Sequence, residues 1–129
     1  MAGTAARSPA YGVVMVEVSG ELDIATRDRL RAEVEPWLRA GRELVLEVSG
    51  LTFIDASGLA GLLELDRLAG RAGTRLLIAG HSRPVHRLLQ MTGLDGHFGP
   101  AERPAARPRL PLEPLHLQPG DRAPGIRRL

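Results

Sequence analysis

The sequence has no cysteine, and aromatic residues make up only 3% of its 129 residues. The absence of cysteine excludes disulfides, thiolate metal sites and cysteine nucleophiles. With so few aromatic rings the chain has no stacking platform for single-stranded nucleic acid, and its core must be aliphatic. It also lacks a secretory signal pattern and any run near the roughly 18 apolar residues of a membrane-spanning helix. We therefore expect one cytoplasmic domain without membrane insertion.

Lysine is absent as well, so all 17 basic residues are arginine. Residues 1–99 contain 11 arginines against 12 acidic residues, a net charge of −1, whereas residues 100–129 contain 6 against 3, a net charge of +3. The positive charge therefore gathers in the last part of the chain and does not indicate a basic face on a folded domain. We expect no direct contact with nucleic acid.

Strand and helix patterns alternate along residues 11–99, which we interpret as the folded domain. Strands are predicted over 11–19, ending at Gly20, and over 43–48 and 75–79. Helices are predicted to begin at Thr26, after Ser57 and at Ser82. Such alternation predicts an α/β fold, in which helices pack on a small mixed, mainly parallel β-sheet of about four strands.

The two ends of the chain read differently from this domain. Residues 1–10 are small and polar and are interpreted as a flexible arm. Residues 100–129 hold seven of the ten prolines and show no period, so we predict a disordered Pro/Arg-rich tail. Composition alone also leaves open a proline-rich ligand for a groove-type domain.

Functional surfaces of parallel sheets lie beyond the carboxyl ends of the strands, where two loops are expected here. The first, residues 20–26, contains Asp23, and the second, residues 51–58, contains Asp55, Ser57 and Gly58. Ser57 stands at a predicted helix start, where its hydroxyl can cap backbone N–H groups, and Gly58 would leave the approach to that hydroxyl open. Capping and turn formation explain the same residues without any further function.

A phosphate on Ser57 would act on binding more than on folding. It adds about −1.5 to −2 charge, and a helix N-terminus favours an anion by roughly 0.3–1 kcal/mol. A protein docked on that surface would meet this charge beside Asp23 and Asp55, and like charges across an interface cost several kcal/mol.

Three motifs stand in order along the chain: Gly20-Glu-Leu-Asp23, Asp55-Ala-Ser-Gly-Leu59 and Met91-Thr-Gly-Leu94. Together they resemble the STAS family of anti-sigma factor antagonists over roughly residues 12–99. The resemblance implies a STAS-like fold with Ser57 as the phosphorylated residue. It also implies a partner-binding surface that comprises Asp23, Asp55, Ser57, Gly58 and Leu59.

The resemblance further implies a bacterial regulator that is a monomer when free and needs no cofactor or metal. Its unphosphorylated form would bind an anti-sigma factor that is a serine kinase with a histidine-kinase-like ATPase fold, and so release a sigma factor. A metal-dependent serine phosphatase would reverse the modification. The family usually has an additional first strand, for which residues 2–10 are a poor match, and a closing strand, which His97-Phe98 could start.

Two other functions compete with this interpretation. An enzyme is not expected, because Ser57 lacks the glycine two positions earlier that a nucleophile elbow requires. His81 and His86 are also five residues apart, which is not the i, i+4 spacing of a helical metal site. The alternative that stays open is a STAS subunit that docks on the ATPase of a bacterial lipid-transport complex, with Ser57 as a contact or a cap.

Overall fold

The computed structural model describes residues 13–99 and 114–118. These residues form a sheet of four parallel strands in the order β3-β2-β1-β4, together with three helices. The predicted α/β class and the mainly parallel sheet of about four strands are confirmed. In chain order the elements are β1 (Val13–Leu22), α3 (Arg27–Arg39), β2 (Glu43–Ile54), α4 (Ala56–Arg71), β3 (Leu76–Ala79), α5 (Arg83–Met91) and β4 (Leu115–Leu117).

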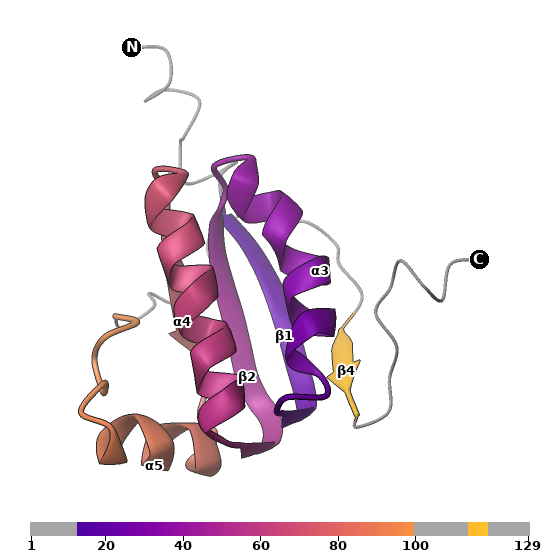
Figure 1. Ribbon diagram of the computed structural model, residues 1–129, viewed down its shortest axis with the longest axis vertical. Coiled ribbons are helices and arrows are strands. Elements are labelled where there is room, and N and C mark those ends of the chain that lie inside the picture. The colour runs from indigo at the N-terminus through magenta and orange to yellow at the C-terminus, as the bar shows by residue number, and fades with distance from the viewer. Residues whose placement is uncertain (1–12, 100–113, 119–129) are drawn as a thin grey trace.

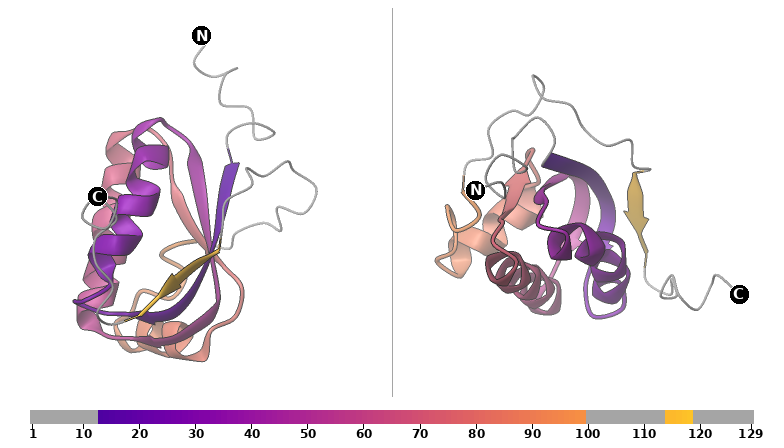
Figure 2. Two further views of the ribbon diagram at one scale, coloured as in Figure 1. Left: turned by 90° about the vertical axis from the view of Figure 1, so that its right-hand side faces the viewer. Right: turned by 90° about the horizontal axis from the view of Figure 1, so that it is seen from above.

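Helices α3 and α4 lie side by side over one face of the sheet, while α5 lies at the lower left, beside the end of β2 (Figure 1). The side view shows the sheet and these two helices as two layers (Figure 2). The core between the layers is aliphatic, as the composition predicts. Its fully buried side chains include Val14, Leu22, Leu30, Val34, Leu38, Leu44, Leu46, Leu62, Leu65 and Leu76.

The helices form where the apolar spacing predicts them. Leu30, Val34 and Leu38 make one buried stripe along α3. Ser82 begins α5: its side chain accepts a hydrogen bond from the backbone N–H of Val85 and donates one to the carbonyl oxygen of Leu51 in β2, at 2.8 Å. The predicted start of this helix is confirmed, and the bond to Leu51 fixes α5 beside the end of β2.

Strands β1 and β2 both continue further than predicted. Gly20 does not end β1; it has a φ of +94°, which glycine adopts without strain, and the strand passes through an irregularity in register to Leu22. Backbone pairing between β1 and β2 extends both strands, up to the pair of Leu22 with Ile54. The two predicted loops are therefore shorter: residues 23–26 and the single residue Asp55.

The prediction of a wholly disordered segment 100–129 is wrong for residues 114–118. Leu115–Leu117 forms β4, which pairs with β1 through Val18, Ser19 and Gly20. The side chains of Leu115 and Leu117 are buried and His116 is exposed, so the short Leu-His-Leu alternation suffices for a strand that completes an existing core. Gly20 permits this pairing, because a Cβ there would lie 1.9 Å from the carbonyl oxygen of Leu117.

The predicted strand start at His97-Phe98 is also wrong. Residue 97 lies in a turn, and the Phe98 side chain is buried against the main core. Residues 1–10, predicted to be a flexible arm, and the remainder of 100–129 lie outside the described residues. Within the described ranges, no helix has both the length and the apolar character that crossing a membrane requires.

Candidate functional site

Two junctions between a strand and a helix meet at one end of the sheet. Because β1 and β2 are parallel and paired to their last residues, Asp23 and Asp55 both follow directly at the same edge of the sheet. The ends of β1 and β2 that pass into α3 and α4 lie at the lower end of the molecule in Figure 1. The backbone N–H of Asp55 donates to the carbonyl oxygen of Leu22 at 3.4 Å. The structure thus brings the two predicted loops together, with Ser57 just beyond Asp55.

Asp55, and not Ser57, is the N-cap of α4. Its backbone is extended, with φ −122° and ψ −172°, and its carboxylate accepts a hydrogen bond from the backbone N–H of Gly58 at 2.9 Å. This is the arrangement typical of a helix N-cap. The predicted capping role of Ser57 is therefore wrong, because an aspartate two residues earlier already bonds the available N–H group.

Ser57 lies in the first turn of α4 and is partly exposed. Its hydroxyl forms no hydrogen bond with any part of the chain that the structure describes, whereas its backbone carbonyl accepts one from Nη1 of Arg27 at 3.3 Å. A hydroxyl without an internal role, on a residue that solvent reaches, is available for contact with a partner or for chemical modification.

Gly58 and Leu59 serve the fold. A Cβ at position 58 would lie 2.2 Å from the carbonyl oxygen of Leu22, so glycine lets the first turn of α4 approach the end of β1. This packing accounts for the glycine, and its role in leaving the approach to the Ser57 hydroxyl open stays a prediction. Leu59 is only 6% exposed. Neither residue presents a side chain to a partner, and both instead hold α4 in place beneath Ser57.

The first junction, residues 23–26, is held together by hydrogen bonds among its own residues and to the end of β1. The Asp23 carboxylate accepts from the backbone N–H groups of Ala25 at 2.9 Å and Thr26 at 3.1 Å. Thr26 is fully buried; its hydroxyl donates to the carbonyl oxygen of Glu21 at 2.7 Å and accepts from the N–H of Asp23 at 3.0 Å. Thr26 holds the predicted N-cap position of α3, but its side chain makes no capping bond.

Sequence reasoning missed three residues of this surface. Ile24 and Phe53 are large apolar side chains that are 61% and 44% exposed, one within the first junction and one near the end of β2. Arg27 reaches from α3 to the Ser57 carbonyl. A large apolar residue within a turn of otherwise small or polar residues is a usable signal for Ile24. The exposure of Phe53 and the reach of Arg27 depend on packing between distant segments.

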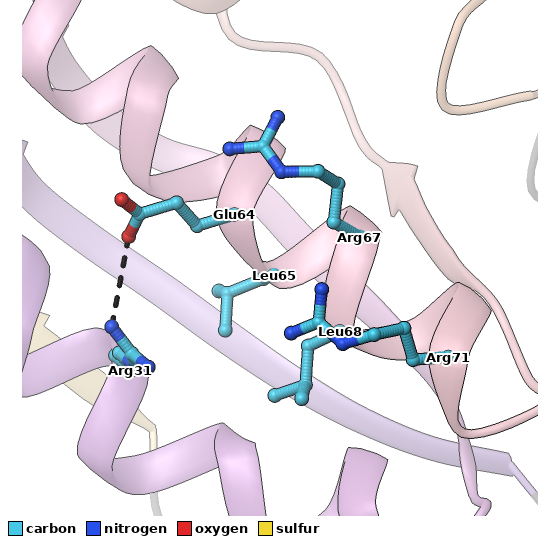
Figure 3. Close-up of a pocket in the computed structure, with 6 residues that line it drawn as sticks. All are labelled: Arg31, Glu64, Leu65, Arg67, Leu68 and Arg71. Atoms are coloured by element: carbon cyan, nitrogen blue, oxygen red, sulfur yellow. Dashed lines mark ion pairs between the residues drawn. The ribbon is translucent and has the colours of Figure 1, made fainter.

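A hollow of about 180 Å³ lies between α3 and α4, away from the two junctions (Figure 3). It is lined by Arg31, Glu64, Leu65, Arg67, Leu68 and Arg71, and Arg31 forms an ion pair with Glu64 there at 3.7 Å. Beside it, hydrogen bonds from Arg39 and then Arg31 hold the pKa of the Glu35 carboxyl below its usual value. Within the described ranges no group of three or more His, Asp or Glu side chains could hold a metal ion.

Comparisons with known proteins agree with this architecture. The family model described as "Mlab, STAS domain" matches residues 7–101. An anti-sigma F factor antagonist of Paenibacillus polymyxa is 38% identical over 85 residues, which cover 64% of this chain and 73% of the relative. An anti-sigma-B factor antagonist of Bacillus subtilis (strain 168) is 25% identical over 81 residues, which cover 63% of this chain and 74% of the relative.

A solved structure has the same fold. It is that of the anti-sigma factor antagonist SpoIIAA in its unphosphorylated form, which superposes with a TM-score of 0.59 at 25% sequence identity and covers 73% of this chain and 84% of its own. The match of the family model, these relatives and the shared fold lead to one conclusion. The chain belongs to the STAS domain family of anti-sigma factor antagonists, as its motifs predicted.

Proposed function

We propose that this protein is an anti-sigma factor antagonist whose unphosphorylated form binds an anti-sigma factor with serine-kinase activity, and that phosphorylation of Ser57 ends this binding. The observation that carries the proposal is the state of Ser57. It is partly exposed in the first turn of α4, and its hydroxyl has no bond to the described residues. The names of the relatives support an anti-sigma factor as the partner.

The docking surface consists of Ser57, the junction carboxylates Asp23 and Asp55, and the exposed side chains of Ile24 and Phe53. Each of the two apolar side chains is about half exposed, so a partner that covers it gains roughly half of the about 1.5–3 kcal/mol that burial of a fully exposed side chain provides. This surface replaces part of the set expected from the motifs, because Gly58 and Leu59 are buried and act as its support.

Phosphorylation changes the docking surface and leaves the scaffold intact. The kinase transfers the γ-phosphoryl group of ATP to Oγ of Ser57, with release of ADP and the hydroxyl proton. The capping bond between Asp55 and Gly58 does not involve Oγ, so α4 keeps its N-cap. A docked partner would have to desolvate a phosphate next to two aspartates and two apolar side chains, at a cost of several kcal/mol. About 2.8 kcal/mol already lowers the affinity a hundredfold.

The switch also needs a reverse reaction. A serine phosphatase that hydrolyses the phosphate on Ser57 would restore the docking surface. The partly exposed position of Ser57 suits both enzymes, since a kinase and a phosphatase must each reach Oγ.

The test uses the anti-sigma factor that co-purifies with this protein from its own cells. Incubation with that protein and ATP should add one phosphate, located at Ser57 by mass spectrometry. Ser57→Ala should bind the partner persistently in the presence of ATP, and Ser57→Asp should bind it about a hundredfold more weakly. Ser49→Ala is the matched control, because Ser49 is an exposed serine whose hydroxyl is bonded to Glu47. Phosphate on another residue, with Ser57→Ala still modified, would refute the proposal.

The matching family model bears the name Mlab, not that of an anti-sigma factor antagonist, and this favours one second candidate. In it, the protein is a STAS subunit that docks on the ATPase of a bacterial lipid-transport complex, and Ser57 is a contact or a helix residue only. The same co-purification separates the two functions. A transporter ATPase as the partner, with equal affinity for Ser57→Ala and the unmodified protein in the presence of ATP, would establish the second.

A further inference from the structure

Arg27 extends from α3 across to the first turns of α4. Its Nη1 donates a hydrogen bond to the backbone carbonyl oxygen of Ser57 at 3.3 Å. The stem of the side chain passes over Gly61, where a Cβ would lie 3.2 Å from Cβ, 3.5 Å from Cδ and 3.8 Å from Cγ of Arg27. A glycine at position 61 thus leaves the space in which the guanidinium can reach Ser57.

The hydrogen bond from Arg27 to the Ser57 carbonyl oxygen is weaker than a hydrogen bond from a guanidinium to an anion. Its acceptor is a neutral carbonyl oxygen at a long distance, and in an α-helix such a carbonyl also accepts from the N–H four residues on. Within the part of the chain that the structure describes, Arg27 forms no ion pair, whereas Arg31 is paired with Glu35 and Glu64. Arg27 therefore has most of its five donors available for an anion.

We propose that Arg27 is the counter-ion of the phosphate on Ser57, which it would bind by moving its guanidinium from the Ser57 carbonyl to the phosphate oxygens. The inference rests on the proposed phosphorylation of Ser57. Arginine suits the role because its planar guanidinium binds phosphate through two parallel hydrogen bonds. The phosphate would then be held against the surface of its own protein, at a fixed place in the docking surface, despite Asp23 and Asp55 nearby.

The test places phosphoserine at position 57 during synthesis of the full chain, so that no kinase is needed, and follows the phosphorus NMR signal against pH. Arg27 should lower the second pKa of this phosphate, whose ordinary value is about 6, while Asp23 and Asp55 act in the opposite direction. In Arg27→Gln the pKa should be higher by about 0.5–1 unit than in the unsubstituted phosphoprotein. Arg27→Lys, which keeps a charge and an aliphatic stem, should recover at least half of that difference.

Arg31→Gln is the matched control. Arg31 lies one turn further along α3 and forms ion pairs with Glu35 and Glu64, and its substitution removes the same charge as Arg27→Gln. It should change the phosphate pKa by less than about 0.2 unit, because exposed charges at a distance are largely screened. An unchanged pKa in Arg27→Gln, no recovery in Arg27→Lys, or an equal rise in Arg31→Gln would overturn the inference.

These outcomes are distinct from a failure of the proposed function. If the kinase modifies Ser57 but the titration is the same in Arg27→Gln, only the counter-ion role is wrong. If the titration shifts as expected but the phosphate added in cells maps to another residue, the geometry around Arg27 stands and the proposed phosphorylation of Ser57 fails.

Discussion

The two junctions at the carboxyl end of the sheet are built from similar residues, but the hydroxyl group is buried and hydrogen-bonded in one and partly exposed in the other. Each has an aspartate directly after its strand and a hydroxyl residue shortly afterwards: Asp23 with Thr26, and Asp55 with Ser57. Thr26 is fully buried, and its hydroxyl both donates and accepts hydrogen bonds. Ser57 is partly exposed, and its hydroxyl has no such bonds in the described structure.

The length of each junction causes the difference. Residues 23–26 separate β1 from α3, so the Asp23 carboxylate folds back on the turn and Thr26 points toward the end of β1. Only Asp55 separates β2 from α4, so its carboxylate caps the helix itself and Ser57 falls within the first helical turn. Because Asp55 caps the helix, the Ser57 hydroxyl is not needed for capping and stays available for the proposed phosphorylation.

The largest expected effect comes from the glycine that joins the two junctions. In Gly58→Val the new Cβ would lie 2.2 Å from the carbonyl oxygen of Leu22, which is backbone and cannot yield cheaply. We expect a loss of about 3 kcal/mol in the free energy of unfolding, measured by urea denaturation. Gly70→Ala is the matched control on the same helix: a Cβ there meets nothing within 4 Å, so stability should rise by about 0.4–1 kcal/mol. Equal small effects at both positions would show that α4 can move away from β1.

The second prediction tests the contrast between the two hydroxyl groups. Thr26→Val keeps the shape of the side chain but leaves the Glu21 carbonyl and the Asp23 N–H without their buried partner, so it should cost about 1–3 kcal/mol. Ser57→Ala should change the free energy of unfolding by less than about 0.5 kcal/mol. Both are measured by chemical denaturation of the unphosphorylated protein. Comparable losses in the two variants would mean that Ser57 has a structural role, and the comparison would fail.

Sequence reasoning predicted that the two loops of the candidate site meet at one edge of the sheet, because the patterns behind that prediction are local. The spacing of apolar residues predicts the order of strands and helices. Parallel strands bring their carboxyl ends to one edge of the sheet, so Asp23, Asp55 and Ser57 are predicted to lie close together. The choice of cap did not follow, because Asp55 and Ser57 are both good N-cap residues. The backbone conformation at Asp55 decides between them, and it depends on pairing with β1 that continues to Leu22.

Contacts between distant segments account for the rest. In the sequence, Gly58 is only a small residue next to a serine. In the structure it packs against the backbone carbonyl of Leu22 at the end of β1, a contact that the sequence does not indicate. In the sequence, β4 is three residues within a proline-rich segment. It forms a strand because it pairs with the edge of β1, where Gly20 has no side chain that would block the approach. A three-residue alternation carries too little periodic signal to be predicted without its partner strand.

The smallest expected effect concerns the cap itself. Asp55→Ala should lower the free energy of unfolding by about 1 kcal/mol, whereas Asp55→Asn, which keeps an acceptor for the Gly58 N–H, should lower it by only a few tenths. The double variant Asp55→Ala/Ser57→Ala sharpens the comparison, because Ser57 lies past the cap position and cannot replace the lost carboxylate. The two changes should therefore add within about 0.5 kcal/mol in a double-mutant cycle measured by urea denaturation. A double variant clearly less stable than the sum of the single ones would mean that the serine takes over the capping bond, and that its hydroxyl is less available than the structure indicates.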